Sequence, residues 1–579
     1  MTKQAPNLEP IRHSLAHLLA AAVLELWPQA KPTIGPAIDT GFYYDFDFKK
    51  PISEEDLPKI EKKMREILKT WEKFTGKKVS KKEALKYFAD NPFKRELVEE
   101  ISTKGEDITF YTSGKFTDLC RGGHVSSAKE ISEQSFKLTS IAGAYWRGSE
   151  KNPMLTRIYG AAFQTKQELE DYLKQALEAK KRDHRLLGPK LELFMFHETS
   201  PGMPYWLPKG VAIYNELINF WREDHRARGY QEIVSPLLNK KELYVTSGHY
   251  EHYWDSMFTA KTKEGEEYGV KAMNCPNAMV VFGSRPRSYK DLPLRLSDTD
   301  TLHRNELSGT LSGLLRVREF RQDDAHIFVT EDQIGEEYDN IFQIVERFYS
   351  IFGIEYSYRL GTRPESYLGD VKTWNKAEAT LEQILKKNKK PYTVAEKDGA
   401  FYGPKVDILI KDVIGREWQL GTIQLDFQQP RRFELEYIAA DGKKKTPVVI
   451  HRVIYGSLER FIAILIEHFA GAFPLWLAPV QVVILPISDE QNGYAEKVAS
   501  ELRTTVRGLR LEIDDRSESI GRKIRDAELL KIPYMLIVGK KEVQEKTVSL
   551  RQRGEKDLGA MKLEKFVDKI RKEIETKAL

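Results

Sequence analysis

The sequence predicts a multidomain α+β protein. Its 579 residues are too many for one hydrophobic core, so we expect about three or four domains. Segments with helical periodicity and short strand-like runs are mixed throughout the chain, which is typical of α+β domains. A charged stretch near residue 170 and the proline-containing run "FPLWLAPV" separate three structured parts.

The first part, residues 1–164, is predicted to be an α+β domain, because helical periods such as "LPKIEKKMREILKTWEKF" alternate with apolar runs such as "GFYYDFDF". Near its start, "HSLAH" places His13 and His17 on one face of a helix. Further on, "TDLCRGGHV" holds Cys120, one of only two cysteines, and His124. Three imidazoles and a thiol are compatible with a zinc site, a hydrolytic pocket or ordinary packing.

The rest of the chain divides into three segments. Residues 165–187 are predicted as one charged amphipathic helix, a linker that ends before the "GP" at 188–189. Residues 188–475 alternate long helices with adjacent strand-like runs such as "KVDILIKD" and "EWQLGTIQLDF", which predicts a largely antiparallel sheet flanked by helices. Residues 476–579 alternate "VQVVILPI" and "YMLIVG" with helical stretches, which predicts a small α/β domain.

Composition excludes several classes of protein. The chain has 91 Lys and Arg against 86 Asp and Glu, and this net charge of +5 permits an anionic partner without demanding one. No run of about 18 apolar residues is present, so no membrane span is expected. The apolar stretch near the N-terminus is interrupted by Glu, Pro and His, unlike a signal peptide. Two cysteines in so long a chain argue for a reducing cytoplasm.

The segment "LHRNELSGTLSGLLRVREFRQDDAHIF", residues 302–328, predicts a site for a nucleotide. If two strands are joined by its Gly/Ser turn, Arg304, Glu306 and Arg316 lie on one face. Guanidinium groups suit phosphate oxygens, while a carboxylate can accept hydrogen bonds from the adenine amino group. Further on, "YGSLERF" places Arg460 at the start of a helix, where a third arginine would lie near the nucleotide.

These segments, in this order, resemble the second and third motifs of class II aminoacyl-tRNA synthetases. The helical run "AIYNELINFWREDHRARGY", which leads into "QEIVSPLL" with Pro236, is similar to the first motif. In that class the first motif forms the dimer interface, so the resemblance implies a homodimer. It also implies the class II fold for residues 188–475, an antiparallel sheet flanked by helices.

A thiol and two imidazoles adjoin these motifs: Cys275 in "KAMNCPNAM", His326 in "QDDAHIF" and His451 in "VVIHRVIYG". Each alone is more often a buried core residue, but three protein ligands together leave zinc with an open position, as in catalytic sites. The chain resembles the threonyl-tRNA synthetase family over essentially its whole length, through "AGAYWRG", "SPGMPYWLPKG", "MNCP" and "REWQLGTIQLDF" among other segments. In that family one zinc per subunit takes the amino and hydroxyl groups of threonine, which excludes the nearly isosteric valine.

The resemblance implies ligation of L-threonine to tRNA(Thr) through a threonyl-adenylate, with ATP accompanied by Mg²⁺. It implies two groups of residues around the site. The catalytic residues are Arg304, Glu306, Arg316, Arg460 and Lys405, and the substrate-binding residues are Gln322, Asp324, Tyr402, Gln419, Gln424 and Ser457. Asn277, Ala278, Leu307 and Glu319 depart from the usual family residues, and we expect these departures to affect loop geometry only.

Serine keeps both groups that zinc would bind, and a missing methyl discriminates by roughly 1–3 kcal/mol. A second, hydrolytic site is therefore expected. The resemblance assigns it to residues 1–164, an editing domain for seryl-tRNA, with His13, His17, Lys94, Asp118, Cys120 and His124 in its pocket. We expect His13 or Lys94 to activate water, while a zinc site and a purely structural cluster stay open. Gly123 stands where the family usually has proline.

The C-terminal domain resembles the anticodon-binding domain of several class II enzymes. In "VGKKEVQEKTVSLRQRG", we expect Glu542, Arg551 and Arg553 to contact unstacked anticodon bases. Bacterial members of the family commonly carry a ubiquitin-like domain before the editing domain. Here the His-x-x-x-His pattern begins at residue 13, so we expect no such domain in this chain.

Three other functions compete with this interpretation. A serine- or proline-specific synthetase of the same class would activate a different amino acid with ATP. A non-catalytic RNA-binding regulator built on the same scaffold would usually lack nucleotide-binding or metal-binding residues, and those are present here. An unrelated metallohydrolase activity of the N-terminal cluster would leave seryl-tRNA intact.

Overall fold

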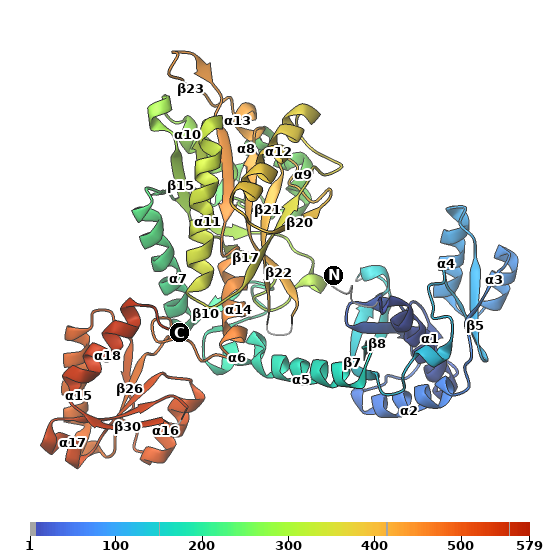
Figure 1. Ribbon diagram of the computed structural model, residues 1–579, viewed down its shortest axis with the longest axis horizontal. Helices are drawn as coiled ribbons and strands as arrows, with labels where there is room; N and C mark the ends of the chain where they lie inside the picture. The colour runs from blue at the N-terminus through green and yellow to red at the C-terminus, as the bar shows by residue number, and fades with distance from the viewer. Residues whose placement is uncertain (1–6, 150, 413–414, 555) are drawn as a thin grey trace. The chain divides into compact units, whose positions relative to one another are not determined.

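The computed structural model describes residues 7–149, 151–412, 415–554 and 556–579 (Figure 1). The chain forms two compact units, residues 1–177 and residues 178–579, called here the N-terminal and C-terminal units. Both contain helices and mixed or antiparallel sheets, so the predicted multidomain α+β class is confirmed. Within the described residues, no helix is both long and apolar enough to cross a membrane.

The N-terminal unit is built around helix α1 (Glu9–Leu26), whose buried residues include Leu15, Leu18, Leu19 and Val23. This helix packs against a five-stranded antiparallel sheet and helix α2 (Leu57–Leu68). The sheet strands are β1 (Lys31–Pro32), β2 (Ala37–Ile38), β3 (Gly41–Asp47), β7 (Phe136–Tyr145) and β8 (Met154–Ala162). A second sheet with its helices comprises β4 (Thr75–Lys78), β5 (Thr109–Ser113), β6 (Phe116–Leu119), α3 (Lys81–Tyr87) and α4 (Pro92–Thr103).

The predicted linker helix over 165–187 is wrong at its end. Helix α5 (Lys166–Arg182) stops because Asp183 leaves the helical conformation and accepts a hydrogen bond from the Arg185 amide. An aspartate in this position starts a new helix. Helix α6 (His184–Lys190) follows, and it contains the Gly-Pro pair that the sequence suggested as a boundary.

The C-terminal unit contains an eight-stranded sheet. Its inner strands run antiparallel, as predicted, whereas the outermost pairs β11–β15 and β19–β20 are parallel. The order across the sheet is β11 (Gln231–Glu232), β15 (Leu294–Asp298), β18 (Asp324–Val329), β25 (Val448–Val453), β22 (Glu417–Asp426), β21 (Lys405–Lys411), β19 (Tyr356–Gly361) and β20 (Tyr392–Ala395).

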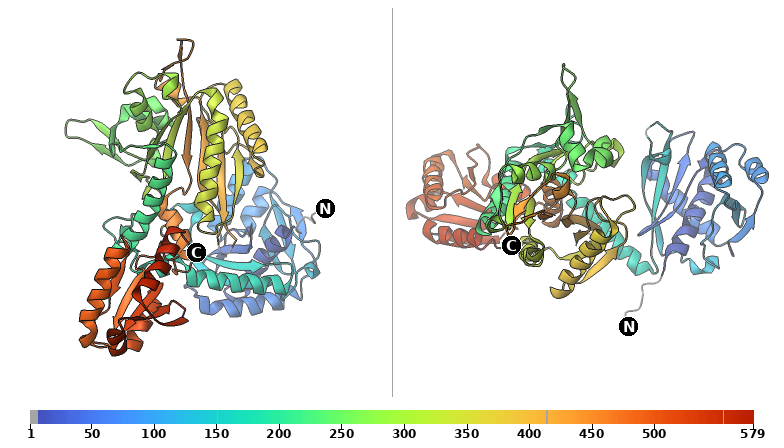
Figure 2. Two further views of the ribbon diagram at one scale, coloured as in Figure 1. Left: turned by 60° about the vertical axis from the view of Figure 1, so that its left-hand side comes forward. Right: turned by 90° about the horizontal axis from the view of Figure 1, so that it is seen from above.

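Residues alternate between the two faces of this sheet. On β18, Ala325, Ile327 and Val329 belong to the main hydrophobic core, together with residues of α11 (Ile334–Ser350) and α12 (Val371–Lys387). The views in Figures 1 and 2 show these two helices lying along one face of the sheet. The opposite face is therefore left for the polar residues between them, such as His326 on β18 and His451 on β25, which are paired in register.

Smaller elements surround this polar face. The segment predicted as two strands joined by a Gly/Ser turn forms the antiparallel hairpin β16 (Thr301–His303) and β17 (Glu319–Arg321). Helix α14 (Leu458–His468) begins at Ser457, whose hydroxyl accepts from the Arg460 amide. The other elements are α7 (Pro208–Ala227), α8 (Lys241–Ser247), α9 (His249–Tyr253), α10 (Cys275–Gly283), α13 (Gln429–Arg432) and the short strands β9 (Phe194–Met195), β10 (Tyr205–Trp206), β12 (Leu238–Lys240), β13 (Thr259–Lys261), β14 (Glu267–Val270), β23 (Tyr437–Ile438) and β24 (Lys444–Lys445).

The end of the chain forms the predicted small α/β fold. Three parallel strands and two antiparallel ones make a sheet with its own hydrophobic core. The strands, in sheet order, are β27 (Leu511–Ile513), β26 (Val482–Pro486), β28 (Tyr534–Val538), β29 (Val548–Gln552) and β30 (Lys556–Met561), and the helices are α15 (Asn492–Thr505), α16 (Ile520–Leu529), α17 (Lys540–Glu545) and α18 (Leu563–Glu575).

Candidate functional site

The polar face of the large sheet opens into a cavity of about 410 Å³. Every residue predicted for the nucleotide, the amino acid or the metal lines it, except Lys405. The lining residues from the prediction are Cys275, Arg304, Glu306, Arg316, Gln322, Asp324, His326, Tyr402, Gln419, Gln424, His451, Ser457 and Arg460.

Lys405 lies outside this lining. Its ammonium Nζ is 3.0 Å from Asp407 Oδ2 and 3.1 Å from Asp398 Oδ2. The position of Lys405 therefore does not support its predicted catalytic role. Gln419 lines the cavity, but its side-chain amide donates to Asp407 at 2.7 Å and accepts from Arg359 at 3.2 Å.

Three arginines meet at one end of the cavity. Arg460 donates through Nε to the Leu315 carbonyl at 2.9 Å, and Arg316 donates to the Glu306 carboxylate at 2.9 Å and 2.7 Å. Burial lowers the pKa of Arg460, and the positive charges of Arg316 and Arg304 lower it further. Since these like charges repel one another in a partly desolvated space, an anion such as a polyphosphate would relieve the repulsion.

The Cys275, His326 and His451 side chains converge at the other end. Their ligand atoms all lie within 4.8 Å of one another, and all three residues are buried. His451 Nε2 is 2.9 Å from Asp426 Oδ2, the kind of contact that orients a metal-binding imidazole. In the described part of the chain, His326 Nδ1 is buried and has no hydrogen-bond partner. An imidazole with an unpartnered nitrogen, in a cluster with a thiol and a second imidazole, fits a metal ligand.

Electrostatics agree with a cation here. Burial holds the pKa of His326 well below its usual value, so its lone pair is available at neutral pH. Burial raises the pKa of the Cys275 thiol well above its usual value. A thiolate would therefore need a nearby positive charge, which a bound metal ion supplies.

Sequence reasoning missed two neighbours of Cys275. His249 is buried at the start of α9, with Nε2 3.7 Å from Cys275 Sγ. Nothing in the spacing of "SGHYEHYW" points to this contact, since 26 positions separate the two residues. Asn274 donates a hydrogen bond to Asp324 Oδ2 at 3.1 Å. Its position directly before Cys275 in the sequence could have indicated that it lies at this site.

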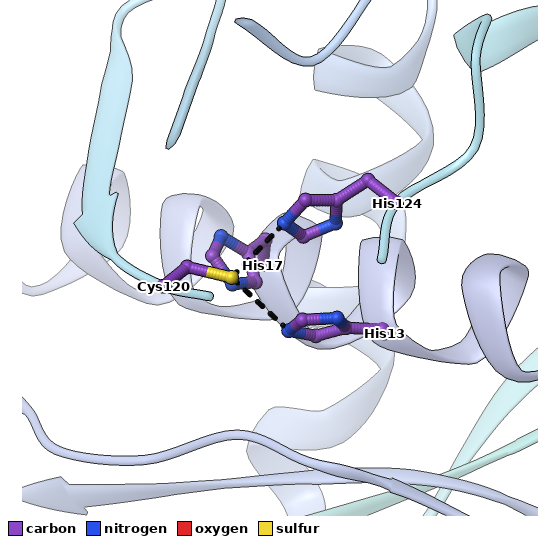
Figure 3. A group of neighbouring side chains, drawn as sticks. All are labelled: His13, His17, Cys120 and His124. Carbon is purple, nitrogen blue, oxygen red and sulfur yellow. Dashed lines mark hydrogen bonds between the residues drawn. The ribbon is translucent and has the colours of Figure 1, made fainter. Parts of the chain in front are cut away.

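The N-terminal unit brings its predicted cluster together, as Figure 3 shows. Cys120 Sγ lies 3.5 Å from His13 Nε2 and 3.3 Å from His124 Nε2. His13, His17 and Cys120 line a pocket of about 480 Å³, whereas His124 is not part of its lining. His124 stacks on Phe74 instead, with ring centroids 4.4 Å apart.

The loop that carries Cys120 requires glycine at two positions. Gly122 and Gly123 have φ angles of +99° and +85°, and a β-carbon on Gly122 would lie 2.5 Å from the Tyr111 hydroxyl. Proline is fixed near φ −65°, so the proline that the family usually has could not adopt this conformation at Gly123. The backbone at Gly123 therefore has a conformation that a proline at this position could not adopt.

Burial keeps the imidazoles of the cluster neutral. It lowers the pKa of His13, lowers that of His17 well below its usual value, and lowers that of His124 to about 2. Burial also raises the pKa of the Cys120 thiol to about 11. The protonated Cys120 thiol therefore lies within hydrogen-bond distance of two neutral imidazoles, so the ring nitrogens that face it have a partner. His326 Nδ1 in the other cluster has no partner within the described residues.

Lys94 lies beside this cluster in a buried network. Its Nζ is 2.5 Å from Asp118 Oδ1, and Tyr44 donates to the other carboxylate oxygen at 2.5 Å. Lys94 and Asp118 are 2% and 3% exposed, so each charge depends on the other. A lysine that serves as the counter-ion of a buried carboxylate is poorly suited to take a proton, which leaves His13 as the better of the two predicted bases.

Of the three residues predicted for anticodon contact, Glu542 lies in helix α17, Arg551 on strand β29 and Arg553 just after that strand, and two of them are engaged within the fold. Glu542 accepts from the Gly539 amide at 2.9 Å and from Ser549 Oγ at 2.8 Å. Arg553 donates to the carbonyl groups of Phe473 and Lys531. Within the described residues, Arg551 Nε is buried without a hydrogen-bond partner.

Family comparisons match all three structured parts. Residues 258–469 match the family described as "tRNA synthetase class II core domain (G, H, P, S and T)". Residues 481–573 match "Anticodon binding domain", and residues 108–159 match "Threonyl and Alanyl tRNA synthetase second additional domain". The fold and the cavity with its three arginines therefore define a class II aminoacyl-tRNA synthetase.

Individual relatives narrow this class. The chain is 53% identical over 569 residues to threonine–tRNA ligase of Caldanaerobacter subterraneus subsp. tengcongensis, covering 98% of this chain and 87% of that protein. It is 50% identical to threonine–tRNA ligase of Thermotoga neapolitana, covering 98% and 88%. A crystal structure of the RNA binding domain of threonyl-tRNA synthetase from Cryptosporidium parvum Iowa II superposes with a TM-score of 0.65 at 42% identity, covering 67% of this chain and 98% of that one.

The chain belongs to the threonine–tRNA ligase family. As a member, it is an enzyme that aminoacylates tRNA with threonine and carries an editing-type second additional domain. ATP, the amino acid and tRNA are its substrates, and ATP is used with Mg²⁺ in this family.

Replacing Asp118 by Asn should destabilise the N-terminal unit by about 3–5 kcal/mol, because the Lys94 ammonium would stay buried without its counter-ion. Hydrogen exchange of amides in β5, β6 and α4, measured in the full chain, reports this local stability. Glu83→Gln is the matched control, since Glu83 pairs with the exposed Lys77 and should change exchange little. Unchanged protection in Asp118→Asn would contradict the importance of the buried pair.

Proposed function

We propose that this enzyme activates threonine as the adenylate at a zinc-dependent site, transfers it to tRNA(Thr), and hydrolyses seryl-tRNA(Thr) in the N-terminal unit. The observation that carries the first part is the convergence of three arginines and a Cys-His-His cluster in one cavity. The second part is supported by the pocket beside His13, His17 and Cys120.

Adenylate formation needs positioning and charge neutralisation. The threonine carboxylate attacks the α-phosphorus of ATP, and the bond to the pyrophosphate oxygen breaks. Arg304, Arg316 and Arg460 would neutralise the phosphate charge. The Glu306 carboxylate accepts a hydrogen bond from Arg316, and its remaining lone pairs can accept a hydrogen bond from the adenine amino group. Mg²⁺ would accompany the nucleotide.

One zinc ion per subunit would be held by Cys275, His326 and His451. When bound, it would supply an open coordination position that suits the amine and hydroxyl of threonine, whereas valine offers no oxygen there. Tyr402 donates to Gln424 Oε1 at 2.6 Å, which holds the amide beside the cluster for contact with the amino acid. Asp324, held by Asn274, is the carboxylate best placed to accept from the substrate ammonium.

Amino-acid-dependent exchange between ATP and pyrophosphate tests this function. We expect strong exchange with threonine, weaker exchange with serine and almost none with valine. Arg460→Ala should lower kcat/KM for ATP by roughly 10²–10³-fold, since it removes a charge that stabilises the transition state. Exchange that is strongest with another amino acid would contradict threonine specificity, and an unaffected Arg460→Ala variant would contradict the nucleotide assignment.

Metal analysis of purified protein tests the zinc assignment. We expect one zinc per chain in the wild type and in Cys120→Ala, and none in Cys275→Ala. The reason is that His326 Nδ1 is orphaned whereas the thiol of Cys120 has hydrogen-bonding neighbours. If the wild type instead holds two zinc ions per chain and each cysteine variant loses one of them, the N-terminal cluster also binds metal. That result would contradict the role of His13 as the general base.

Editing is hydrolysis of an ester. We propose that neutral His13 takes a proton from water as its oxygen bonds to the ester carbonyl carbon. The bond to the ribose oxygen then breaks, and that oxygen leaves with the proton, which releases serine and tRNA. The buried Lys94, Asp118 and Tyr44 network would hold the pocket wall and orient the aminoacyl group.

The deacylation rate should follow the ionisation of His13. Its neutral form acts as base, and burial lowers its pKa, so the rate should stay level down to about pH 6.5 and fall only below it. Single-turnover deacylation of seryl-tRNA between pH 5 and 9 measures this profile. His13→Ala should remove most of the activity and, with it, the fall in rate at low pH. His197 is an exposed histidine of the C-terminal unit, so His197→Ala should leave both the rate and its pH profile unchanged. A profile that rises through pH 8 would favour a different base.

Three further assignments complete the proposal. We propose a homodimer through the first motif, supported by exposed apolar side chains that follow α7, among them Val234 at 85% and Leu238 at 52% exposure.

We propose contact between Arg551 and anticodon bases, supported by its buried Nε. Two unpaired cysteines support a reducing cytoplasm as the compartment.

A further inference from the structure

A buried histidine outside the cavity connects three segments of the C-terminal unit. His184 is 1% exposed at the start of α6. Its Nδ1 lies 2.7 Å from Glu467 Oε1, at the end of α14. Its Nε2 accepts a hydrogen bond from the Leu314 amide at 3.1 Å, in the loop between β16 and β17. Neither the predicted site nor the proposed mechanism uses this residue.

The hydrogen bonds fix the tautomer of this imidazole. A backbone N–H can only donate, so Nε2 must present its lone pair to Leu314. The ring proton therefore lies on Nδ1 and is donated to Glu467. Both nitrogens are thus used, and the ring orientation is set by α14 on one side and by the loop amide on the other.

Leu314 belongs to the turn that carries the nucleotide contacts. The Ser312 amide donates to the Arg316 carbonyl at 3.2 Å, which closes the turn. The carbonyl of the next residue after Leu314, Leu315, accepts from Arg460 Nε at 2.9 Å. The side chain of Arg316 donates to Glu306. A shift of the Leu314 amide would therefore displace groups that line the cavity.

Gly313 lets the turn approach the imidazole. Its φ angle is +50°, and a β-carbon on it would lie 2.3 Å from His184 Nε2. No side chain fits at that distance, so glycine is required for this contact. The fold thus places a glycine, a buried histidine and a loop amide against one another, and none of the three residues is part of the cavity lining.

We propose that His184 is a positioning residue for the nucleotide site, acting through the amide of Leu314. It holds the turn in the conformation in which the Leu315 carbonyl orients Arg460. The inference rests on the proposed contact of Arg460 and Glu306 with ATP. Since a small misplacement of catalytic groups lowers rates steeply, the effect should appear in the kinetics of ATP more than in those of threonine.

Two substitutions separate the two hydrogen bonds of His184. Asparagine places an amide nitrogen near the position of Nδ1 and can donate to Glu467, but it does not reach Leu314. Glutamine is longer, and its Oε1 can accept from the Leu314 amide. Glu467→Gln is the matched control, because its side-chain oxygen can still accept from Nδ1. The measurement is threonine-dependent exchange between ATP and pyrophosphate by the full chain, with melting temperatures recorded for each variant.

We expect His184→Asn to lower kcat/KM for ATP by about tenfold with an unchanged KM for threonine. His184→Gln should recover most of this loss, and Glu467→Gln should match the wild type. If His184→Asn does not fold, Gly313→Ala provides the same test from the loop side and should show the same ATP-specific loss.

A wild-type kcat/KM for ATP in a folded His184→Asn protein would overturn the inference. Equal losses in the Asn and Gln variants, or parallel changes in both KM values, would also overturn it, since either would indicate a general structural role. These results leave the proposed function standing while Arg460→Ala is impaired. If Arg460→Ala keeps the wild-type kcat/KM for ATP, the nucleotide assignment fails and this inference fails with it.

Discussion

The structure depends on the alternation of side chains along the central strands of the large sheet. On β18, Ala325, Ile327 and Val329 belong to the main hydrophobic core, while Asp324 and His326 line the cavity. On β25, Val448 and Ile450 belong to the same core, while His451 lines the cavity. Antiparallel register then places His326 opposite His451, and Gln424 beside them. Because a slip of one residue would exchange the two faces, the hydrophobic core and the His326–His451 pair specify the same register.

Burial of polar groups on that face has an energetic cost that neighbouring contacts offset. Asp324 is held by Asn274, and Asp426 by His451. Burial raises the pKa of Asp323 to about 7. The positive charge of Arg452 opposes this rise, and so do the hydrogen bonds that the Ile454 and Tyr455 amides donate to the Asp323 carboxylate. Such networks are stable only when nearly complete. His326 Nδ1 is one of the buried atoms in the described residues that keep no partner, and its residue belongs to the cluster with Cys275 and His451.

Sequence reasoning succeeded where chemistry is local in the chain. The hairpin around Arg304 and Arg316 and the helix that begins just before Arg460 follow from local patterns, and these arginines line one cavity. The His13–His17 pair on α1 also follows from spacing. It failed where a contact joins distant segments or a single residue ends a helix. Asp183 interrupts a run with strong helical periodicity, Lys405 turns toward Asp407, and His249 reaches Cys275 through a fold that no spacing encodes. These outcomes are decided by tertiary packing, which a periodicity cannot report.

The break between α5 and α6 changes where one module of this protein begins. A boundary drawn at the Gly-Pro pair would assign His184 to a dispensable connector, yet this residue is buried against Leu314 and Glu467. The C-terminal unit, which begins at Glu178, therefore includes Asp183 and His184. Any chimera that grafts this core onto another accessory domain, or any minimal version of it, should keep α6 intact and be joined within the exposed stretch of α5.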